Sequence, residues 1–455
     1  MKRTNLKTAQ IKQIKLKRKL VLLLSPIVLL VGYASASMAG QNSRSLYTPI
    51  EELGELIFDD TNLSIGRNQS CASCHDLAWG GTGPDSATNA TGAVYEGSIR
   101  GRFGNSKPPS SAYATLSPIF HFSKRGSGHF VGGNFWDGRA TGERLGNPAA
   151  DQAQGPFLNP AEQGLPDSAC VVYRVSTATY ASLYESVWGD NISTISFPAY
   201  TDELCEQEGI SIPLSPDERA KVEQEYDNIA ISIAAYEDSS EVNRFSSKYD
   251  ARRRHGVIFT SQEQRGYELF KGKGNCTSCH VIRGPYAAFT NFSYENLGVP
   301  QNPENPALIA DPTYVDLGLG AFLMRRGETA DVYEAEMGKM KVPTLRNVDK
   351  RPTADSVKAY THNGYFKSLK GLVHFINTRD VKSTCPGLYT EAEALAADCW
   401  PAPEVSTNVN NRLIGNLGLS DEEEDAIVAF LTTLTDDRGE YGRNCDSYAR
   451  CNKKK

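Results

Sequence analysis

The sequence contains the same five-residue pattern twice, as Cys71-Ala-Ser-Cys74-His75 and as Cys276-Thr-Ser-Cys279-His280. Two thiols separated by two residues can both reach the edge of one haem and add across its vinyl groups, and the following histidine places its imidazole beneath the iron. The pattern therefore predicts two covalently bound c-type haems, with His75 and His280 as iron ligands.

Two other interpretations of these cysteines are a zinc site built from four thiolates and a pair of thioredoxin-like redox motifs. Neither explains why a histidine follows the second cysteine in both copies. The upstream residues also repeat, because Gly54-Glu-Leu-Ile-Phe58 precedes the first motif and Gly266-Tyr-Glu-Leu-Phe270 precedes the second. We therefore interpret the chain as an internal duplication of a cytochrome c unit, in which a short amphipathic helix leads into each haem-binding loop.

Residues 1–39 have the pattern of a secretory signal peptide. Eight lysines and arginines, without any acidic residue, precede an apolar run from Leu20 to Val31 and a stretch of small residues that ends at Ala39. The run is shorter than the roughly 20 apolar residues that a membrane-spanning helix needs. We expect cleavage after Ala39 or, alternatively, after Ala36; an uncleaved membrane anchor is a further alternative. The cleaved protein is then exported to the periplasm or the cell surface, without a stable membrane span.

The residues after position 39 are strongly acidic. The whole chain has 48 lysines and arginines and 54 aspartates and glutamates, and eight of the cations lie in residues 1–39. The remaining 40 cations against 54 anions give a net charge of −14. Because nucleic acids and anionic membranes bind basic surfaces, this charge argues against either as the main partner.

Helix signals dominate the chain, so we predict a mainly α fold of two cytochrome c-like domains with long loops rich in glycine and proline. The first domain is predicted to span residues 40–250, and the second residues 251–455, including a C-terminal tail. Between them, the basic run Arg252–Arg254 is interpreted as a solvated linker. Capping signals predict helix starts at three serines: Ser215, Ser261 (with Gln264) and Ser420 (with Glu423).

Six cysteines lie outside the haem motifs: Cys170, Cys205, Cys385, Cys399, Cys445 and Cys451. In an exported chain we expect them to form structural disulfides. Six cysteines allow many pairings. Pairing of sequence neighbours, which we expect, gives Cys170 with Cys205, Cys385 with Cys399 and Cys445 with Cys451.

Further motifs resemble those of the bacterial dihaem cytochrome c peroxidases and their MauG-like relatives. In chain order they are Phe135-Trp-Asp-Gly-Arg139, Gln152-Ala-Gln-Gly-Pro156, Asn159-Pro-Ala-Glu162, Val342-Pro-Thr-Leu-Arg-Asn347 and His362-Asn-Gly364. The resemblance covers nearly the whole chain after the signal peptide. It implies that the haem of residues 40–250 reacts with hydrogen peroxide and that the haem of residues 251–455 stores or relays an electron.

The resemblance assigns catalytic roles to three residues. Trp136 is at the position of a tryptophan between the haems, where an indole can pass an electron or a hole. Glu162 is at the position of the acid above the first haem, and Gln152 and Pro156 belong to the same pocket. Cleaving peroxide requires a group that takes a proton from one oxygen and returns it to the other, which a desolvated carboxylate can do.

The resemblance also implies a calcium ion at the junction of the domains. Its ligands would be Asn105 and the backbone carbonyls of Val357 and Ala359. Water would complete the shell of oxygen ligands that calcium prefers.

Two positions differ from the usual pattern of the family. Thr91 lies where typical peroxidases carry a second histidine that blocks the first iron, so we predict that the first haem is open without reductive activation, as in MauG-like members. Ile376 lies where the second haem has its sixth ligand, methionine in peroxidases and tyrosine in MauG, and isoleucine cannot bind iron. His374 is about 200° away around a helix. Three methionines are alternative ligands: Met324, Met337 and Met340.

The remaining histidines have less specific surroundings. We expect His121 and His129 to contact haem propionates or the backbone, His255 to lie in the exposed linker, and His362 to shape the second haem pocket.

Three functions are compatible with these features. The first is a peroxidase that draws electrons from a small periplasmic donor. The second is a MauG-like enzyme that uses peroxide to oxidise a tryptophan or tyrosine of a partner protein, with a copper protein as one candidate. The third is a non-catalytic electron-transfer cytochrome. Thr91 and Glu162 argue against the third function, and Ile376 weakens the first, because loss of the methionine ligand lowers the potential of the electron-storing haem.

Overall fold

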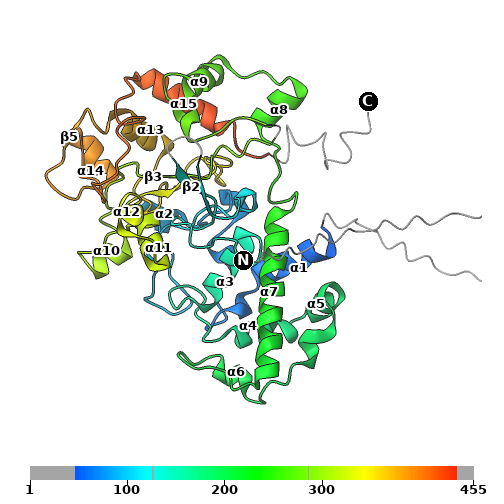
Figure 1. Ribbon diagram of the computed structural model, residues 1–455. Helices are drawn as coiled ribbons and strands as arrows, with labels where there is room; N and C mark the ends of the chain where they lie inside the picture. Colours follow the sequence, from blue (N-terminus) through cyan, green and yellow to red (C-terminus); the bar gives the residue numbers. More distant parts are fainter. Residues whose placement is uncertain (1–46, 125–127, 285, 438–455) are drawn as a thin grey trace, which may run out of the picture. The chain divides into compact units, whose positions relative to one another are not determined.

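The computed structural model describes residues 47–124, 128–284 and 286–437. These residues are mainly α-helical, as predicted (Figure 1). The helices are α1 (Pro49–Asp59), α2 (Ser86–Ala90), α3 (Pro148–Leu158), α4 (Ser168–Ser176), α5 (Ala181–Trp188), α6 (Thr201–Leu204), α7 (Pro216–Asp238), α8 (Lys248–His255), α9 (Ser261–Lys271), α10 (Pro306–Ala310), α11 (Gly318–Arg326), α12 (Ala330–Glu334), α13 (Leu369–Thr378), α14 (Glu391–Ala396) and α15 (Asp421–Thr432).

Strands contribute only short pairs. The antiparallel pairs are β1 (His121–Ser123) with β2 (His129–Val131) and β3 (Tyr294–Glu295) with β4 (Met340–Lys341). The parallel pair is β5 (Ser383–Thr384) with β6 (Cys399–Trp400). No helix in the described part of the chain is both long and apolar enough to cross a membrane. The predicted signal peptide, residues 1–39, lies outside the described residues.

Each haem motif follows a helix that crosses a later helix. Helix α1 packs against α7, and α9 packs against α15 (Figure 1). The glycine of the upstream repeat lies at both crossings: a Cβ atom on Gly54 would overlap the backbone oxygen of Ser232, and one on Gly266 would overlap that of Ala426. Because only glycine lacks this atom, the repeated sequence specifies the same close helix crossing twice.

Two of the three predicted helix starts are confirmed. The hydroxyl of Ser215 accepts a hydrogen bond from the amide of Glu218, and Ser420 forms a capping box with Glu423. The third prediction is wrong by one residue, because the cap of α9 is Thr260, whose hydroxyl accepts from the amide of Glu263. Ser261 is already the first helical residue.

The basic run Arg252–Arg254 is not a linker. It forms the last turn of α8, which begins with a capping box between Ser247 and Asp250. Positive side chains are favourable there because they interact with the negative end of the helix dipole. The guanidinium of Arg252 lies 4.5 Å from the ring centroid of Phe259.

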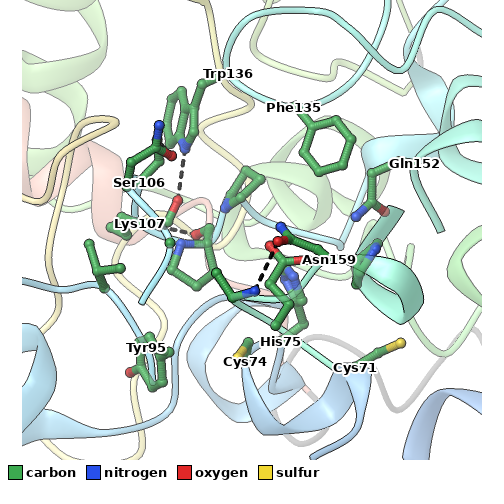
Figure 2. A pocket seen from close by; sticks show the side chains of 18 of the residues that line it. Cys71, Cys74, His75, Tyr95, Ser106, Lys107, Phe135, Trp136, Gln152 and Asn159 are labelled. Carbon is green, nitrogen blue, oxygen red and sulfur yellow. Dashed lines mark hydrogen bonds between the residues drawn. The ribbon is translucent and has the colours of Figure 1, made fainter. Parts of the chain in front are cut away.

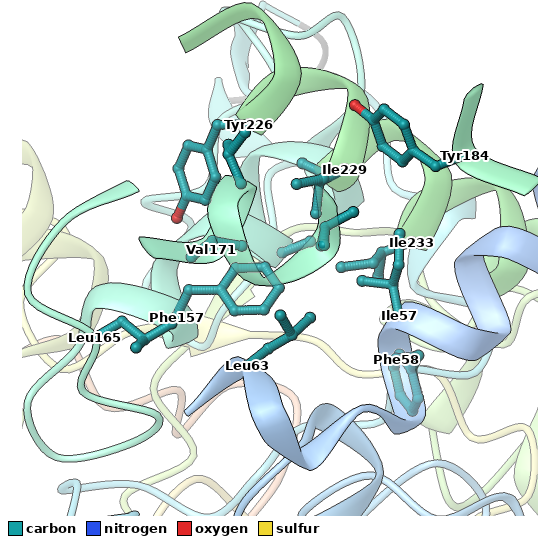
Figure 3. Close-up of a cluster of buried hydrophobic side chains, with 14 of the residues drawn as sticks. Ile57, Phe58, Leu63, Phe157, Leu165, Val171, Tyr184, Tyr226, Ile229 and Ile233 are labelled. Atoms are coloured by element: carbon teal, nitrogen blue, oxygen red, sulfur yellow. The ribbon is translucent and has the colours of Figure 1, made fainter. Parts of the chain in front are cut away.

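The buried apolar side chains form two large clusters. The first draws on residues from Leu53 to Val242 and includes α1, α3, α4 and α7 (Figure 3). The second draws on residues from Tyr249 to Leu434 and includes α9, α13 and α15. Because the described residues belong to one compact unit, the division into domains at residues 250 and 251 stays a prediction.

Two of the predicted disulfides are present. Cys170 pairs with Cys205, and Cys385 pairs with Cys399. The third expected pair, Cys445 with Cys451, lies outside the described residues.

Candidate haem sites

Both Cys-x-x-Cys-His motifs form one 3-10 turn with the same hydrogen bonds. In the first motif, the amides of the second cysteine and of the histidine donate to the carbonyl of Cys71 at 3.1 and 3.0 Å. In the second motif, the equivalent amides donate to the carbonyl of Cys276 at 3.3 and 2.9 Å. All four cysteines are free thiols. Each turn therefore presents two thiols and one imidazole in the arrangement that covalent haem attachment requires.

Both imidazoles are oriented by their backbone partners. The Nδ1 atom of His75 donates to the carbonyl of Gly81 at 3.0 Å, and that of His280 donates to the carbonyl of Phe289 at 2.7 Å. Burial lowers the pKa of His75, and it lowers the pKa of His280 to about 4. Each ring is therefore neutral with its Nδ1 bonded to the backbone, so Nε2 is the nitrogen that would bind a haem iron.

The predicted catalytic residues lie together around the first motif. A cavity of about 740 Å³ is lined by Cys71, Cys74 and His75, and by Trp136, Gln152, Pro156 and Glu162 (Figure 2). Gln152 and Pro156 belong to α3, and Glu162 follows this helix in the turn that begins at Asn159. Residues more than 80 positions apart in the sequence thus meet in one cavity.

Glu162 has the electrostatic surroundings of a proton-transfer group. Burial raises the pKa of its carboxyl, while the charge of Arg139 and a hydrogen bond with the side chain of Asn159 oppose the rise. Its backbone is fixed, since its amide donates to the carbonyl of Asn159 at 2.9 Å and its carbonyl accepts from the amide of Ser98 at 2.7 Å. A raised pKa brings the carboxyl closer to the operating pH, where it can both accept and return a proton.

Arg139 is a site residue that the sequence analysis did not single out. Its guanidinium lies 3.7 Å from the ring centroid of Phe135 and donates to Asp137 at 2.9 Å. It lines the same cavity as Glu162. The available signal was its place at the end of the Phe-Trp-Asp-Gly-Arg motif.

Glu237 is a second site residue that we did not predict. It lies near the C-terminal end of α7, is 3% exposed and lines the first cavity. Burial raises its pKa to about 8, and its Oε2 atom has no hydrogen-bond partner among the described residues. The sequence offered a signal, because Glu237 lies four residues after Ile233 and eight after Ile229 and therefore continues the buried stripe of α7.

Thr91 lies outside the first cavity. It is exposed at the end of α2, where its hydroxyl donates to the carbonyls of Ala87 and Thr88. Among the described residues that line this cavity, His75 is the sole histidine and there is no methionine. This lining supports the prediction that the first haem is open.

The second motif has its own cavity. This cavity of about 240 Å³ is lined by Cys276, Cys279, His280, Ile376 and Met340, together with apolar residues of α13 and α15. Two thiols, an oriented neutral imidazole and an adjoining cavity occur in both halves of the chain. The residues present therefore fit two covalent c-type haems.

The sixth ligand of the second haem has few candidates in this structure. Ile376 lines the second cavity, whereas His374 does not and instead binds Glu424 through Nδ1 at 2.9 Å. Of the methionines in the described residues, Met340 alone lines the cavity. Met324 is an exposed residue of α11.

Trp136 lines both cavities. Its indole Nε1 donates to the carbonyl of Lys107 at 2.8 Å, and its ring centroid is 6.5 Å from that of His362. Lys107 is also common to both cavities, and its amide donates to the carbonyl of His362 at 2.7 Å. The indole therefore lines both candidate haem sites and is held by the carbonyl of Lys107 and the ring of His362.

Comparisons with known proteins agree with this geometry. The family model described as di-haem cytochrome c peroxidase matches residues 49–256. The methylamine utilization protein MauG of Paracoccus denitrificans is 34% identical over 426 residues, which cover 92% of this chain and 95% of MauG. The chain belongs to the dihaem cytochrome c peroxidase and MauG family.

Other members of the family support the assignment. The cytochrome c551 peroxidase of Nitrosomonas europaea is 25% identical, with 94% of each chain covered. The crystal structure of the diheme peroxidase BthA from Burkholderia thailandensis superimposes with a TM-score of 0.65 and 28% identity, with 89% of each chain covered. As a member of this family, the protein is an oxidoreductase with two c-type haems.

Two of the remaining histidines, His121 and His362, have defined hydrogen-bond partners. His121 is exposed and bonds the carbonyl of Ile119 through Nδ1 at 2.8 Å, so the expectation of a backbone partner is confirmed for it. His129 lies in β2 and lines neither cavity. His362 lines the second cavity, as expected, and its Nε2 binds Glu404 at 2.9 Å, which raises its pKa against the effect of burial.

The three residues expected to bind calcium have different surroundings in the structure. Asn105 lines the first cavity, where its Oδ1 accepts from the hydroxyl of Ser106 at 3.1 Å. Ala359 lines the second cavity. The carbonyl of Val357 accepts from the side chain of Asn89 at 3.2 Å.

Proposed function

We propose that this protein is an exported peroxidase that reduces hydrogen peroxide in the first cavity, with electrons relayed through the second haem from a small periplasmic donor. One observation carries the proposal: a desolvated carboxyl, Glu162, lines the same cavity as the metal-binding imidazole of His75, and no second histidine or methionine of the described residues lines it. A cytochrome that only relays electrons has no need of a proton-transfer group beside an open iron.

When bound, the haem supplies the iron that accepts peroxide and exchanges electrons with it. Glu162 takes the proton from the oxygen nearer the iron and returns it to the farther oxygen, which leaves as water. The guanidinium of Arg139 faces the same cavity and stabilises the negative charge that develops as the oxygen–oxygen bond breaks. The amide of Gln152 is a hydrogen-bond donor for orienting the peroxide.

Trp136 connects the two halves of the reaction. Because its indole lines both cavities, it offers a π-system through which oxidising equivalents move between the haems. The hydrogen bond to Lys107 fixes the plane of the ring.

A second candidate function is MauG-like oxidation of a tryptophan or tyrosine of a partner protein. Ile376 in the second cavity weakens the peroxidase, because this side chain cannot supply the methionine ligand that tunes an electron-storing haem, but this position lacks the tyrosine ligand of MauG as well. The 34% identity to MauG, against 25% to the peroxidase of N. europaea, favours the MauG-like function. A copper protein as the partner stays a prediction, as does the non-catalytic alternative.

The substitution Glu162→Gln tests the proposal. Proton transfer by a placed side chain contributes about 10²–10⁴-fold, so the haem absorbance change after stopped-flow mixing with peroxide should slow by that factor at unchanged haem content. Glu143→Gln, which alters an exposed carboxyl paired with Arg326, is the matched control and should react at the unmutated rate. If Glu162→Gln reacts with peroxide as fast as the unmutated protein does, Glu162 has a structural role only. If the unmutated protein does not react with peroxide at all, the proposed peroxidase function is wrong.

A further inference from the structure

The side chain of Lys107 is buried among neutral groups. The residue is 7% exposed, and its Nζ donates to the hydroxyl of Thr82 and to the carbonyl of Pro108, both at 2.9 Å. Within the described residues it has no carboxylate partner. Burial lowers the pKa of Lys107 to about 8, so the ammonium form still predominates at pH 7.

This ammonium group acts on both haem sites. Lys107 lines both cavities, and its charge adds to the effect of burial in lowering the pKa of His75, the first iron ligand. It also lowers the pKa of Lys358, a buried residue that lines the second cavity. An uncompensated buried charge is felt strongly because the protein interior screens it poorly.

The segments expected to bind calcium do not fit that ion here. Calcium takes six to eight oxygen ligands; of the three expected here, the carbonyl of Val357 already accepts from the side chain of Asn89, and the Oδ1 of Asn105 already accepts from the hydroxyl of Ser106. Between the expected carbonyl ligands Val357 and Ala359 lies Lys358, whose Nζ donates to three backbone carbonyls. Two residues after Asn105 lies Lys107. A divalent cation bound to these segments would be repelled by the two ammonium groups that the segments carry.

We propose that the ammonium group of Lys107 is the resident cation between the two haem sites, in place of a calcium ion, and that its charge raises the reduction potentials of both haems. A fixed positive charge favours the reduced iron, which carries one positive charge fewer. The proposal rests on the two haems of the proposed function but not on peroxide turnover.

Lys341 provides a matched comparison. It is a second buried lysine with neutral partners, since its Nζ donates to the hydroxyl of Ser117 and to the side-chain oxygen of Asn134 at 2.8 and 2.7 Å. Unlike Lys107, it lines the second cavity and not the first. Burial lowers the pKa of Lys341 to about 7 and that of Lys107 to about 8, so the two side chains are compared at pH 6, where both are charged. Removal of the Lys341 charge should then affect one haem, whereas removal of the Lys107 charge should affect both.

Spectroelectrochemical titration of the holoprotein, without peroxide, tests the proposal. In Lys107→Met, the ratio of reduced to oxidised haem at a fixed applied potential should fall by roughly a factor of ten at both haems, the scale of a unit charge in a protein interior. Lys341→Met should lower the ratio at the second haem alone. Lys107→Arg, which keeps the charge, should restore most of the loss. The proposal would be overturned if Lys107→Met changed the ratio of reduced to oxidised haem at only one haem or at neither. It would also be overturned if Lys107→Arg lowered this ratio as much as Lys107→Met does.

Metal analysis of the unmutated protein keeps the test independent of whether the variants fold. Elemental analysis should find calcium well below one ion per chain, and dialysis against EGTA should leave the haem spectra and potentials unchanged. One calcium ion per chain, removed by EGTA with a change in the haem spectra, would contradict the proposal even if peroxidase activity were present.

Discussion

The indole Nε1 of Trp136 donates a 2.8 Å hydrogen bond to the backbone carbonyl of Lys107, and both residues line both haem-site cavities. A peptide carbonyl accepts a hydrogen bond but is not a base at neutral pH. The indole therefore keeps its proton when it gives up an electron, and the same electron can return without a proton transfer. This arrangement suits a reversible relay between two redox centres.

Trp136→Phe should separate peroxide cleavage from redistribution of the oxidation. Phenylalanine lacks the indole nitrogen and is harder to oxidise, so peroxide should still react at the first haem while the spectrum of the second haem stays ferric. Stopped-flow spectra recorded after mixing with peroxide distinguish the two steps. Trp188→Phe is the control, because Trp188 also donates through Nε1, to Ser232 at 2.9 Å, and lines neither cavity. If both haems of Trp136→Phe showed the same spectral changes after mixing with peroxide as those of the unmutated protein, Trp136 would not lie on the electron-transfer path between the haems.

Replacing Cys276 and Cys279 with alanine should remove one of the two haems. Covalent attachment needs the two thiols of each motif, and the first motif is intact in this variant. The haem-to-protein ratio, measured as pyridine haemochrome, should fall by half. A ratio equal to that of the unmutated protein would show that the second motif does not bind haem.

Gly266→Ala should destabilise the second half of the molecule. A Cβ atom at Gly266 would overlap the backbone oxygen of Ala426, so α9 and α15 would have to separate. Overpacking of this kind costs typically about 1–3 kcal/mol, which lowers the midpoint of urea unfolding. Gly387→Ala serves as the control, because no atom lies within 4 Å of the added group. Equal midpoints for the two variants would show that the crossing tolerates a side chain.

Glu237 should make stability fall as the pH rises from about 4.5 to about 8. Its pKa is raised from 4.5 to about 8 in the folded protein, so in this window the unfolded chain has released the proton that the folded chain still holds. Stability then decreases with pH by up to about 1.4 kcal/mol per unit from this group. Glu237→Gln removes the contribution, so its advantage over the unmutated protein in urea unfolding should grow between pH 5 and pH 8.

The control for this experiment is Glu203→Gln, at an exposed position in α6. Its difference from the unmutated protein should be the same at every pH. A difference for Glu237→Gln that is likewise independent of pH would show that the buried carboxyl is already ionised in the folded state.

The local features of this chain could be predicted from the sequence because they depend on neighbouring residues. Both haem motifs form the expected turns, Ser215 and Ser420 cap their helices, and Cys170 pairs with Cys205. Thr260 was missed as a cap because Ser261 offers the same chemistry one residue later. The repeated glycines were noticed, but only the structure shows that each lies where two helices touch.

It was harder to predict which charged residues line the cavities, because their burial depends on segments that are distant in the sequence. Arg139, Glu237 and Lys107 are charged residues, which are usually exposed. Arg139 and Lys107 line the cavities through the packing of long loops, which no periodicity in the sequence encodes, whereas Glu237 continues the buried stripe of α7. Glu162 and Gln152 were identified from a resemblance rather than from their spacing.

We propose that the first haem has an open coordination position beside Glu162. Low-temperature EPR of the diferric holoprotein tests it most directly, with the variant that lacks Cys276 and Cys279 used to assign signals to the first haem. We predict a high-spin ferric signal from the first haem, in the unmutated protein and in the variant. Low-spin signals alone, with no high-spin component in either protein, would show that the first iron has a sixth ligand.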